Sequence, residues 1–266
     1  MRFLRFYAVC ESIVIYFYFL GGFMQNDEVV IESYLKVTSE RKKRRNPARW
    51  DMLQSITGAI LAIFILFHMC FTSSIMLGQD AFNAVVHFSE GSFIFGGNGI
   101  PLLTTLVVVI ISVVFVAHAF LAMRKFPANF QQFMIFKTHK SLMKHCDTTL
   151  WWIQFLTGFA LFFLGGAHLV TILFNSTDIN AITSASRFVN GNLAEFYLVL
   201  LVIMVLHASI GMYRLIIKWV PLEAPTTAQS NVKRKNVKIA VFAVFIVLGV
   251  IAFIADFTWI ALGKSL

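Results

Sequence analysis

Five runs of apolar residues, each long enough to cross a lipid bilayer, dominate this sequence of 266 residues. A membrane-spanning α-helix needs about 20 consecutive apolar residues. The runs lie near residues 52–77, 101–123, 149–174, 193–217 and 237–262. Only 13% of the residues are charged and 58% are hydrophobic, so there are too few polar groups to cover a globule in water. The sequence therefore predicts an all-α fold, a polytopic membrane bundle of five transmembrane helices over residues 52–262.

The basic residues indicate how this bundle is oriented. A net charge of +9 would suggest nucleic acid as the partner of a soluble protein. Here, however, Lys and Arg gather between the apolar runs, in segments 36–49, 124–144 and 214–238, whereas the other connections hold only Arg187. Connections rich in Lys and Arg stay in the cytoplasm. We therefore expect a bacterial inner-membrane protein that binds no nucleic acid, with residues 24–51 cytoplasmic and the C-terminus periplasmic.

A sixth apolar run, near residues 3–24, does not fit this orientation. If it crossed the membrane, the strongly basic segment after it would be exported, against the charge rule. Either residues 1–23 lie on the membrane surface, or the natural chain begins at Met24 and the extension comes from a wrongly chosen start codon. The second interpretation is favoured, and mass spectrometry of the intact N-terminus would decide between them.

Four of the seven histidines lie inside apolar runs, one in each of the first four: His68, His118, His168 and His207. An ionisable side chain inside a membrane is costly and commonly marks function. For any single histidine the alternative is an interhelical hydrogen bond, which contributes about 0.6 kcal/mol on average. The remaining three, at 87, 139 and 145, fall in connections where solvent is expected.

The depths of the four histidines sort them into two pairs. At about 1.5 Å per residue, His68 and His168 stand roughly 20–25 Å from the cytoplasmic ends of their helices, and His118 and His207 stand roughly 9–16 Å from that side. Two stacked pairs of imidazoles are what two b-type haems in one bundle require. Haems held by imidazole on both faces transfer electrons and do not bind oxygen. The outer pair would be His68 with His168, and the inner pair His118 with His207.

Three segments of the sequence resemble a known family. HAFLAMRKFP (118–127), FKTHKSLMKHCDTTLWWIQ (136–154) and LHASIGMYRL (206–215) are similar to the dihaem cytochrome b subunit of quinol:fumarate reductases, within the succinate:quinone oxidoreductase superfamily. The resemblance runs from about Met24 to the end of the fifth apolar run. It supports Met24 as the start, because MQNDEVVIESYLKVTSERKK is similar to that family's N-terminus.

The resemblance implies a complex of three proteins, acting in anaerobic respiration. A flavoprotein reduces fumarate, an iron–sulfur subunit relays electrons, and this chain anchors both at the cytoplasmic side and oxidises menaquinol. The resemblance also implies that two such heterotrimers can associate as a dimer. The connections of this chain are too short to form a dicarboxylate active site of their own.

The resemblance also assigns roles to residues. The four histidines fall on the axial ligand positions, and propionate contacts of the inner haem map to Gln54, Ser55, Trp151 and Lys218. Arg187 and Lys125 map as further propionate partners, although Lys125 and Lys218 have the alternative of snorkelling to the interface. Glu90 matches the glutamate that accepts protons from menaquinol, a role suited to a carboxylate at an apolar pocket. A solvated loop glutamate is its alternative.

One position departs from the family pattern. Well-studied members carry a glutamate two residues before the fourth ligand, on a proton path across the membrane, and this sequence has Val205 there. Valine cannot carry a proton, and neither Glu195 nor Asp256 is an evident substitute. Compensating proton transfer would need another route.

Other functions remain open at the level of sequence. The same complex can run in reverse as a succinate dehydrogenase. A cytochrome b of a hydrogenase or formate dehydrogenase also uses histidines in the membrane, but one histidine on each of four successive helices favours the first family. A proton-coupled transporter is a rival of another class; the sequence shows no sign of inverted repeats, and a haem spectrum would separate the two classes.

Overall fold

The computed structural model describes residues 46–266 apart from 96, 98, 144 and 145. The expectations for residues 1–23, and all but the end of the segment 24–51, lie outside these described residues. Within them, five helices are long and apolar enough to cross a membrane. They are α3 (Asn46–Ser73), α6 (Pro101–Met123), α8 (Cys146–Phe174), α10 (Ala194–Trp219) and α11 (Thr227–Ser265). The prediction of an all-α chain with five spans is confirmed.

The helix α11 begins about three turns before the apolar run that predicted it. It starts at Thr227, and the Thr226 side chain caps it by accepting a hydrogen bond from the Gln229 N–H at 3.3 Å. The basic residues from Lys233 to Lys238 are therefore helical rather than part of a loop. A capping threonine followed by good helix formers favours this extension, which a search for apolar runs does not detect.

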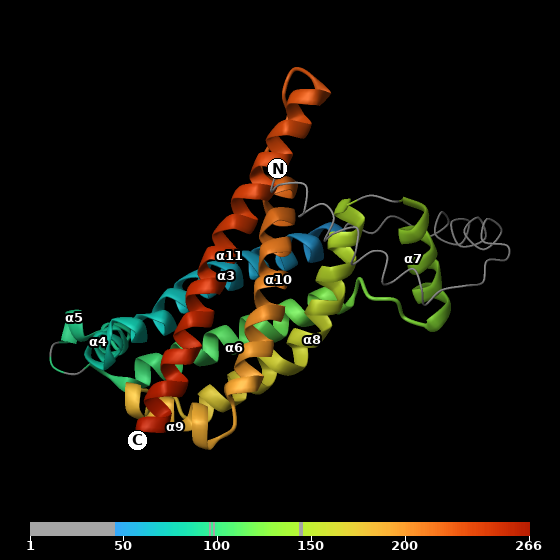
Figure 1. The fold of residues 1–266 in the computed structure, drawn as a ribbon. Coiled ribbons are helices and arrows are strands. Elements are labelled where there is room, and N and C mark those ends of the chain that lie inside the picture. Colours follow the sequence, from blue (N-terminus) through green and yellow to red (C-terminus); the bar gives the residue numbers. More distant parts are fainter. Residues whose placement is uncertain (1–45, 96, 98, 144–145) are drawn as a thin grey trace. The chain divides into compact units, whose positions relative to one another are not determined.

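The connections on the side expected to be periplasmic contain short helices. They are η1 (Ser74–Leu77), α4 (Gln79–Ser89), α5 (Ser92–Phe95) and α9 (Ala181–Asn190). The Asn180 side chain caps α9 by accepting from the Thr183 N–H. Phe82 of α4 and Phe188 of α9 join Trp259 of α11 in one buried apolar cluster, near the C-terminal end of α11 (Figure 1). This cluster closes one end of the bundle.

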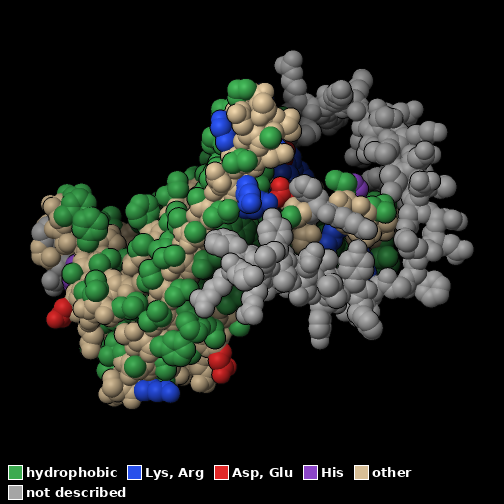
Figure 2. All heavy atoms as spheres, turned by 45° about the horizontal axis from the view of Figure 1, so that its top comes forward, with side chains coloured by type: hydrophobic (Ala, Val, Ile, Leu, Met, Phe, Trp, Pro, Cys, Tyr) green, Lys and Arg blue, Asp and Glu red, His purple; other side chains and the backbone are tan. Residues whose placement is uncertain are grey.

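Each long helix packs against at least two of the other long helices. α10 lies against α8 and α11, α6 lies against α3 and α8, and α3 also contacts α10 and α11. The outward faces carry large apolar side chains such as Val113, Phe120, Val247 and Phe257, each more than half exposed. Hydrophobic side chains cover the body of these helices in Figure 2. Such a surface suits lipid and not water.

Residues 127–143 belong to a compact unit separate from the one that contains residues 45–126 and 144–266. Its described element is α7 (Phe130–Met143). The side chain of Asn129 caps this helix, accepting a hydrogen bond from the Gln132 N–H at 2.9 Å. α7 carries His139, which is exposed.

Candidate functional site

A large cavity lies among the long helices, and all four intramembrane histidines line it. Its volume is about 1340 Å³, above the roughly 300–1,000 Å³ of a usual single-ligand pocket. His68 comes from α3, His118 from α6, His168 from α8 and His207 from α10. Most of the remaining lining is apolar or aromatic, which suits a flat hydrophobic cofactor.

The two histidines expected as the outer pair face each other. The ring centroids of His68 and His168 are 6.0 Å apart, with 63° between the ring planes. A metal held between two imidazole nitrogens by bonds of about 2.0–2.1 Å would place the centroids about 6 Å apart. Phe64 stacks on His68, and Tyr197 of α10 packs edge-on against His168. The pair therefore has the separation and aromatic support that an axial ligand pair needs.

The other two histidines are engaged by neighbouring helices. His118 Nδ1 lies 3.1 Å from the Thr57 hydroxyl on α3. His207 Nδ1 lies 3.3 Å from the Thr157 hydroxyl and 3.2 Å from the Gln154 carbonyl oxygen on α8. His118 and His207 both line the same cavity. The structure thus brings together the residues of the expected inner pair.

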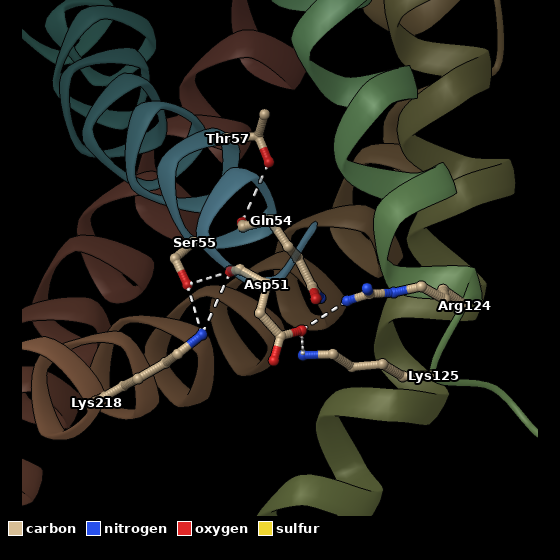
Figure 3. Close-up of polar contacts among 7 residues, drawn as sticks. All are labelled: Asp51, Gln54, Ser55, Thr57, Arg124, Lys125 and Lys218. Atoms are coloured by element: carbon tan, nitrogen blue, oxygen red, sulfur yellow. Dashed lines mark hydrogen bonds and ion pairs between the residues drawn. The ribbon is translucent and has the colours of Figure 1, made fainter. Parts of the chain in front are cut away.

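Three of the four residues expected to bind inner propionates meet at one end of the cavity wall. Lys218 Nζ donates hydrogen bonds to the Ser55 hydroxyl at 3.1 Å and to the Asp51 carbonyl oxygen at 3.3 Å. Gln54 lies beside them on α3 (Figure 3). Trp151 lines the same cavity from α8. Amide, hydroxyl and ammonium groups gathered here can bind a carboxylate.

Asp51 is a member of this polar group that sequence reasoning missed. Its Oδ1 accepts from Arg124 at 2.6 Å and lies 3.0 Å from Lys125 Nζ. Lys125, expected as a propionate partner, therefore has a carboxylate partner within the chain itself. The spacing of Asp51 before Gln54 and Ser55, one turn of the same helix, was the available signal.

Arg187 lines the opposite end of the cavity, from α9. Its guanidinium donates hydrogen bonds to the Asp178 carbonyl oxygen and to the Ser184 hydroxyl, each at 3.1 Å. These contacts hold the side chain at the cavity wall, which Tyr197 and Asp256 also line. A fixed guanidinium there suits the expected role toward a second carboxylate.

Buried polar atoms without a hydrogen-bond partner among the described residues mark the cavity wall. They are Gln54 Oε1, His168 Nδ1, Asp256 Oδ2 and Ser73 Oγ. The first three residues line the cavity, at its two ends and its middle. An unpaired buried polar atom costs about 1–3 kcal/mol, so these atoms fit a wall built around a ligand with polar substituents.

Glu90 is buried, although it lies in the connection between two spans. Its side chain is 7% exposed, and Oε2 lies 3.2 Å from His87 Nδ1. The Ile100 N–H donates to the Glu90 carbonyl oxygen at 2.8 Å. The neighbouring Ser89 lines the cavity. His87, treated in the sequence as an ordinary loop residue, is thus the partner of this carboxylate.

Val205 packs in the contact between α10 and α11. A Cβ added at Gly249 of α11 would lie 3.1 Å from Val205 Cγ2, so the two helices are close at this point. Val205 is also absent from the cavity lining. A side chain as long as glutamate would have to displace α11 or turn elsewhere.

These features define a polytopic membrane protein whose spans enclose a histidine-lined cavity suited to a flat cofactor. Residues 134–251 match the family described as succinate dehydrogenase/fumarate reductase transmembrane subunit. The chain is 45% identical, over 85% of its length and 88% of the relative's, to the fumarate reductase cytochrome b subunit of Wolinella succinogenes. It is 48% identical to that of Helicobacter pylori strain 26695, over 74% of this chain and 76% of the relative.

The chain therefore belongs to the family of fumarate reductase cytochrome b membrane subunits.

Proposed function

We propose that this chain holds two b-type haems in the cavity, with His68 and His168 as axial ligands of the outer haem. His118 and His207 are the ligands of the inner haem. The observation that carries the proposal is the facing of His68 and His168 at 6.0 Å in a wall shared with the other two histidines. When bound, haems with imidazole on both faces supply one-electron transfer and leave no open position for oxygen.

The polar residues at the two ends of the cavity hold the propionates. Gln54, Ser55, Trp151 and Lys218 are the inner set, supported by the hydrogen bond from Lys218 to Ser55 and by the position of all four residues in the cavity wall. Arg187 binds a propionate of the outer haem. Lys125 either contributes to a propionate or stays with Asp51, and its 3.0 Å contact with that carboxylate favours the second role, which keeps a positive charge at the cavity mouth.

Glu90 is the proton acceptor for menaquinol oxidation. A quinol that gives up two electrons must also release two protons, and a buried carboxylate beside an apolar pocket can take one. His87 Nδ1, at 3.2 Å from Glu90 Oε2 and 43% exposed, offers the next step toward solvent. The electrons leave through the bundle toward the cytoplasmic side. An iron–sulfur subunit and a flavoprotein subunit receive them there and use them to reduce fumarate.

The basic cytoplasmic face is the docking side for those two subunits. The chain sits in the inner membrane with residues 24–51 in the cytoplasm and the C-terminus in the periplasm, as the distribution of Lys and Arg implies. Val205 leaves the family's proton path without its glutamate, so proton return across this bundle uses other groups or does not occur.

Haem content of the purified complex tests the proposal. A reduced-minus-oxidised spectrum should show b-type α-bands equivalent to roughly two haems per chain. The variants His168→Ala and His207→Ala should each remove one of two resolvable redox transitions, the outer and the inner respectively. The matched control is His139→Ala, because His139 is exposed on α7 and should keep both. A colourless wild-type complex, or two intact transitions in both cavity variants, would overturn the assignment.

A further inference from the structure

A five-residue pattern occurs twice in the chain, each time beside a histidine of the inner pair. Helix α3 carries Gln54-Ser55-Ile56-Thr57-Gly58, and helix α8 carries Gln154-Phe155-Leu156-Thr157-Gly158. Both follow the pattern Q-x-x-T-G. The first lies against His118 of α6 and the second against His207 of α10. Each copy therefore meets a histidine that belongs to another helix.

The threonine of each copy lies within hydrogen-bond distance of the imidazole. Thr57 Oγ1 is 3.1 Å from His118 Nδ1, and Thr157 Oγ1 is 3.3 Å from His207 Nδ1. The glutamine contributes its backbone carbonyl: Gln154 O is 3.2 Å from His207 Nδ1, and the Gln54 backbone makes the corresponding hydrogen bond with His118. In both rings Nδ1 thus meets the threonine hydroxyl, and both rings also contact the backbone of the glutamine three residues earlier.

The direction of these hydrogen bonds follows from the acceptor to which each threonine hydroxyl donates its own hydrogen. Thr57 Oγ1 donates to the Leu53 carbonyl oxygen at 2.9 Å, and Thr157 Oγ1 donates to the Ile153 carbonyl oxygen at 2.7 Å. With that proton committed to its own helix, each hydroxyl oxygen is an acceptor for an imidazole N–H. The Gln carbonyls can only accept. The proton of the neutral ring is therefore held on Nδ1, and Nε2 keeps the lone pair that binds a metal.

The glycine of each copy lets the imidazole lie directly on the helix. A Cβ added at Gly58 would stand 3.0 Å from His118 Cε1, and one at Gly158 would stand 2.9 Å from His207 Cε1. Both distances are shorter than ordinary van der Waals contact. Any larger residue would push the ring away from the backbone that orients it.

The outer pair lacks the equivalent support. His168 Nδ1 is buried and has no hydrogen-bond partner within the part of the chain that the structure describes. The ring of His168 instead packs against Tyr197 and faces His68. The pattern is therefore specific to the inner site.

We propose that the two Q-x-x-T-G segments are positioning elements for the inner haem, fixing the tautomer and the ring orientation of its two ligands. The inference rests on the proposed function, because it presupposes that His118 and His207 ligate a haem. An acceptor on Nδ1–H makes the imidazole a stronger electron donor to the metal, which stabilises the ferric state. The two threonines thus hold the midpoint potential of the inner haem below the value that free imidazoles would give.

Redox titration of the purified complex tests this role with Thr57→Val, Thr157→Val and the double variant. Valine keeps the shape of threonine but removes the acceptor. The midpoint potential of the transition that His207→Ala abolishes should rise, more in the double variant than in either single one, with a shift in its low-spin EPR g-values. Thr57→Ser and Thr157→Ser should restore the wild-type values. The outer transition should stay unchanged throughout.

The matched control is Thr171→Val. Thr171 lies on α8 and makes the same bond to the carbonyl four residues back, to Ala167 at 2.9 Å, and it has no cavity histidine as a hydrogen-bond partner among the described contacts. The Thr171→Val variant should leave the midpoint potentials of both transitions unchanged. A general loosening of the helices would instead move both transitions or act equally in the control, and that outcome would overturn the proposal.

The glycines give a second, independent measurement. Gly58→Ala and Gly158→Ala should lower the occupancy of the inner site, or convert its haem partly to a high-spin form, while the outer haem stays low-spin. Two outcomes separate the proposals. If His118→Ala and His207→Ala leave every haem signal intact, the proposed function itself fails. If they remove the inner haem but the threonine and glycine variants change nothing, only the positioning role fails.

Discussion

At the scale of single residues, Glu90 shows how local backbone geometry can bury an acid at the edge of a membrane protein. Gly99 has a φ of +80°, and a Cβ there would lie 2.6 Å from Glu90 Cβ. Such a position is open to glycine at little cost and strained for other residues. The returning chain thus closes over Glu90, and the carboxylate is left with His87 as its side-chain contact.

We expect Glu90→Gln to abolish quinol oxidation, because an amide cannot take up a proton although its size and burial are almost unchanged. Quinol-dependent fumarate reduction should fall to background. Haem content and fumarate reduction driven by a low-potential dye should stay at wild-type levels, since neither uses this proton transfer.

The control for this change is Glu195→Gln. Glu195 is an exposed carboxylate in the first turn of α10, at the same end of the bundle, and its loss should leave quinol oxidation intact. Quinol activity that survives in Glu90→Gln would remove Glu90 from the mechanism.

At the scale of helices, Asp147 joins three elements at the end of the bundle where α8 begins. Its carboxylate, at the start of α8, forms an ion pair with Lys238 of α11 and accepts a hydrogen bond from the Tyr213 hydroxyl of α10 at 3.3 Å. Lys238 Nζ also lies 5.0 Å from the Tyr213 ring centre, within the range of a cation–π contact. Tyr213 is buried, so its hydroxyl depends on this carboxylate.

Asp147→Ala should therefore destabilise the bundle by about 1 kcal/mol, the usual size for a partly exposed ion pair with one added hydrogen bond. The midpoint of thermal haem loss from the purified complex should fall by about 2–4 °C. Glu223→Ala, which removes an exposed carboxylate at the same end, should shift it by less than 1 °C. Equal midpoints for the two variants would show that Asp147 does not join the helices.

The helices also show where sequence patterns are sufficient and where they are not. Length and hydropathy predicted all five spans, because in lipid each long apolar run has to satisfy its own backbone as a helix. The early start of α11 and the capped helix α9 were not predicted. Both depend on polar residues whose helical state is decided by capping and by burial against other helices, which hydropathy does not register.

At the scale of the whole molecule, the ends of the spans differ in charge. The described residues between α6 and α8, the last turns of α10 and the first turns of α11 carry several Lys and Arg residues, whereas the other end of the bundle carries Arg187 and Lys264. A reporter enzyme that is active only in the periplasm should be active when fused after Leu266 and inactive when fused in the connection at residues 220–226. The reverse pattern would invert the orientation, and Glu90, the proposed proton acceptor, would then lie at the cytoplasmic end of the bundle.

The closeness of His68 to His168 was predictable from sequence because both ends of every span could be located. Depth along a straight helix follows from residue counts alone. The partners of Glu90 and Lys125 were not predictable in this way, since His87 and Asp51 reach them through turns and side-chain directions. The repeat around Thr57 and Thr157 was present in the sequence, but a match of five residues acquires meaning only when both copies are seen against histidines of other helices.

The helices α3 and α8 each bear an outer histidine and, about three turns earlier, the segment that seats an inner one. An α-helix advances about 1.5 Å per residue and resists stretching, so these two helices fix the spacing between the two proposed haem sites. Neither of the two proposed haem sites can move along the membrane normal unless the other moves with it. If the two haems are bound as proposed, the backbone hydrogen bonds of α3 and α8 fix the distance that an electron crosses between them.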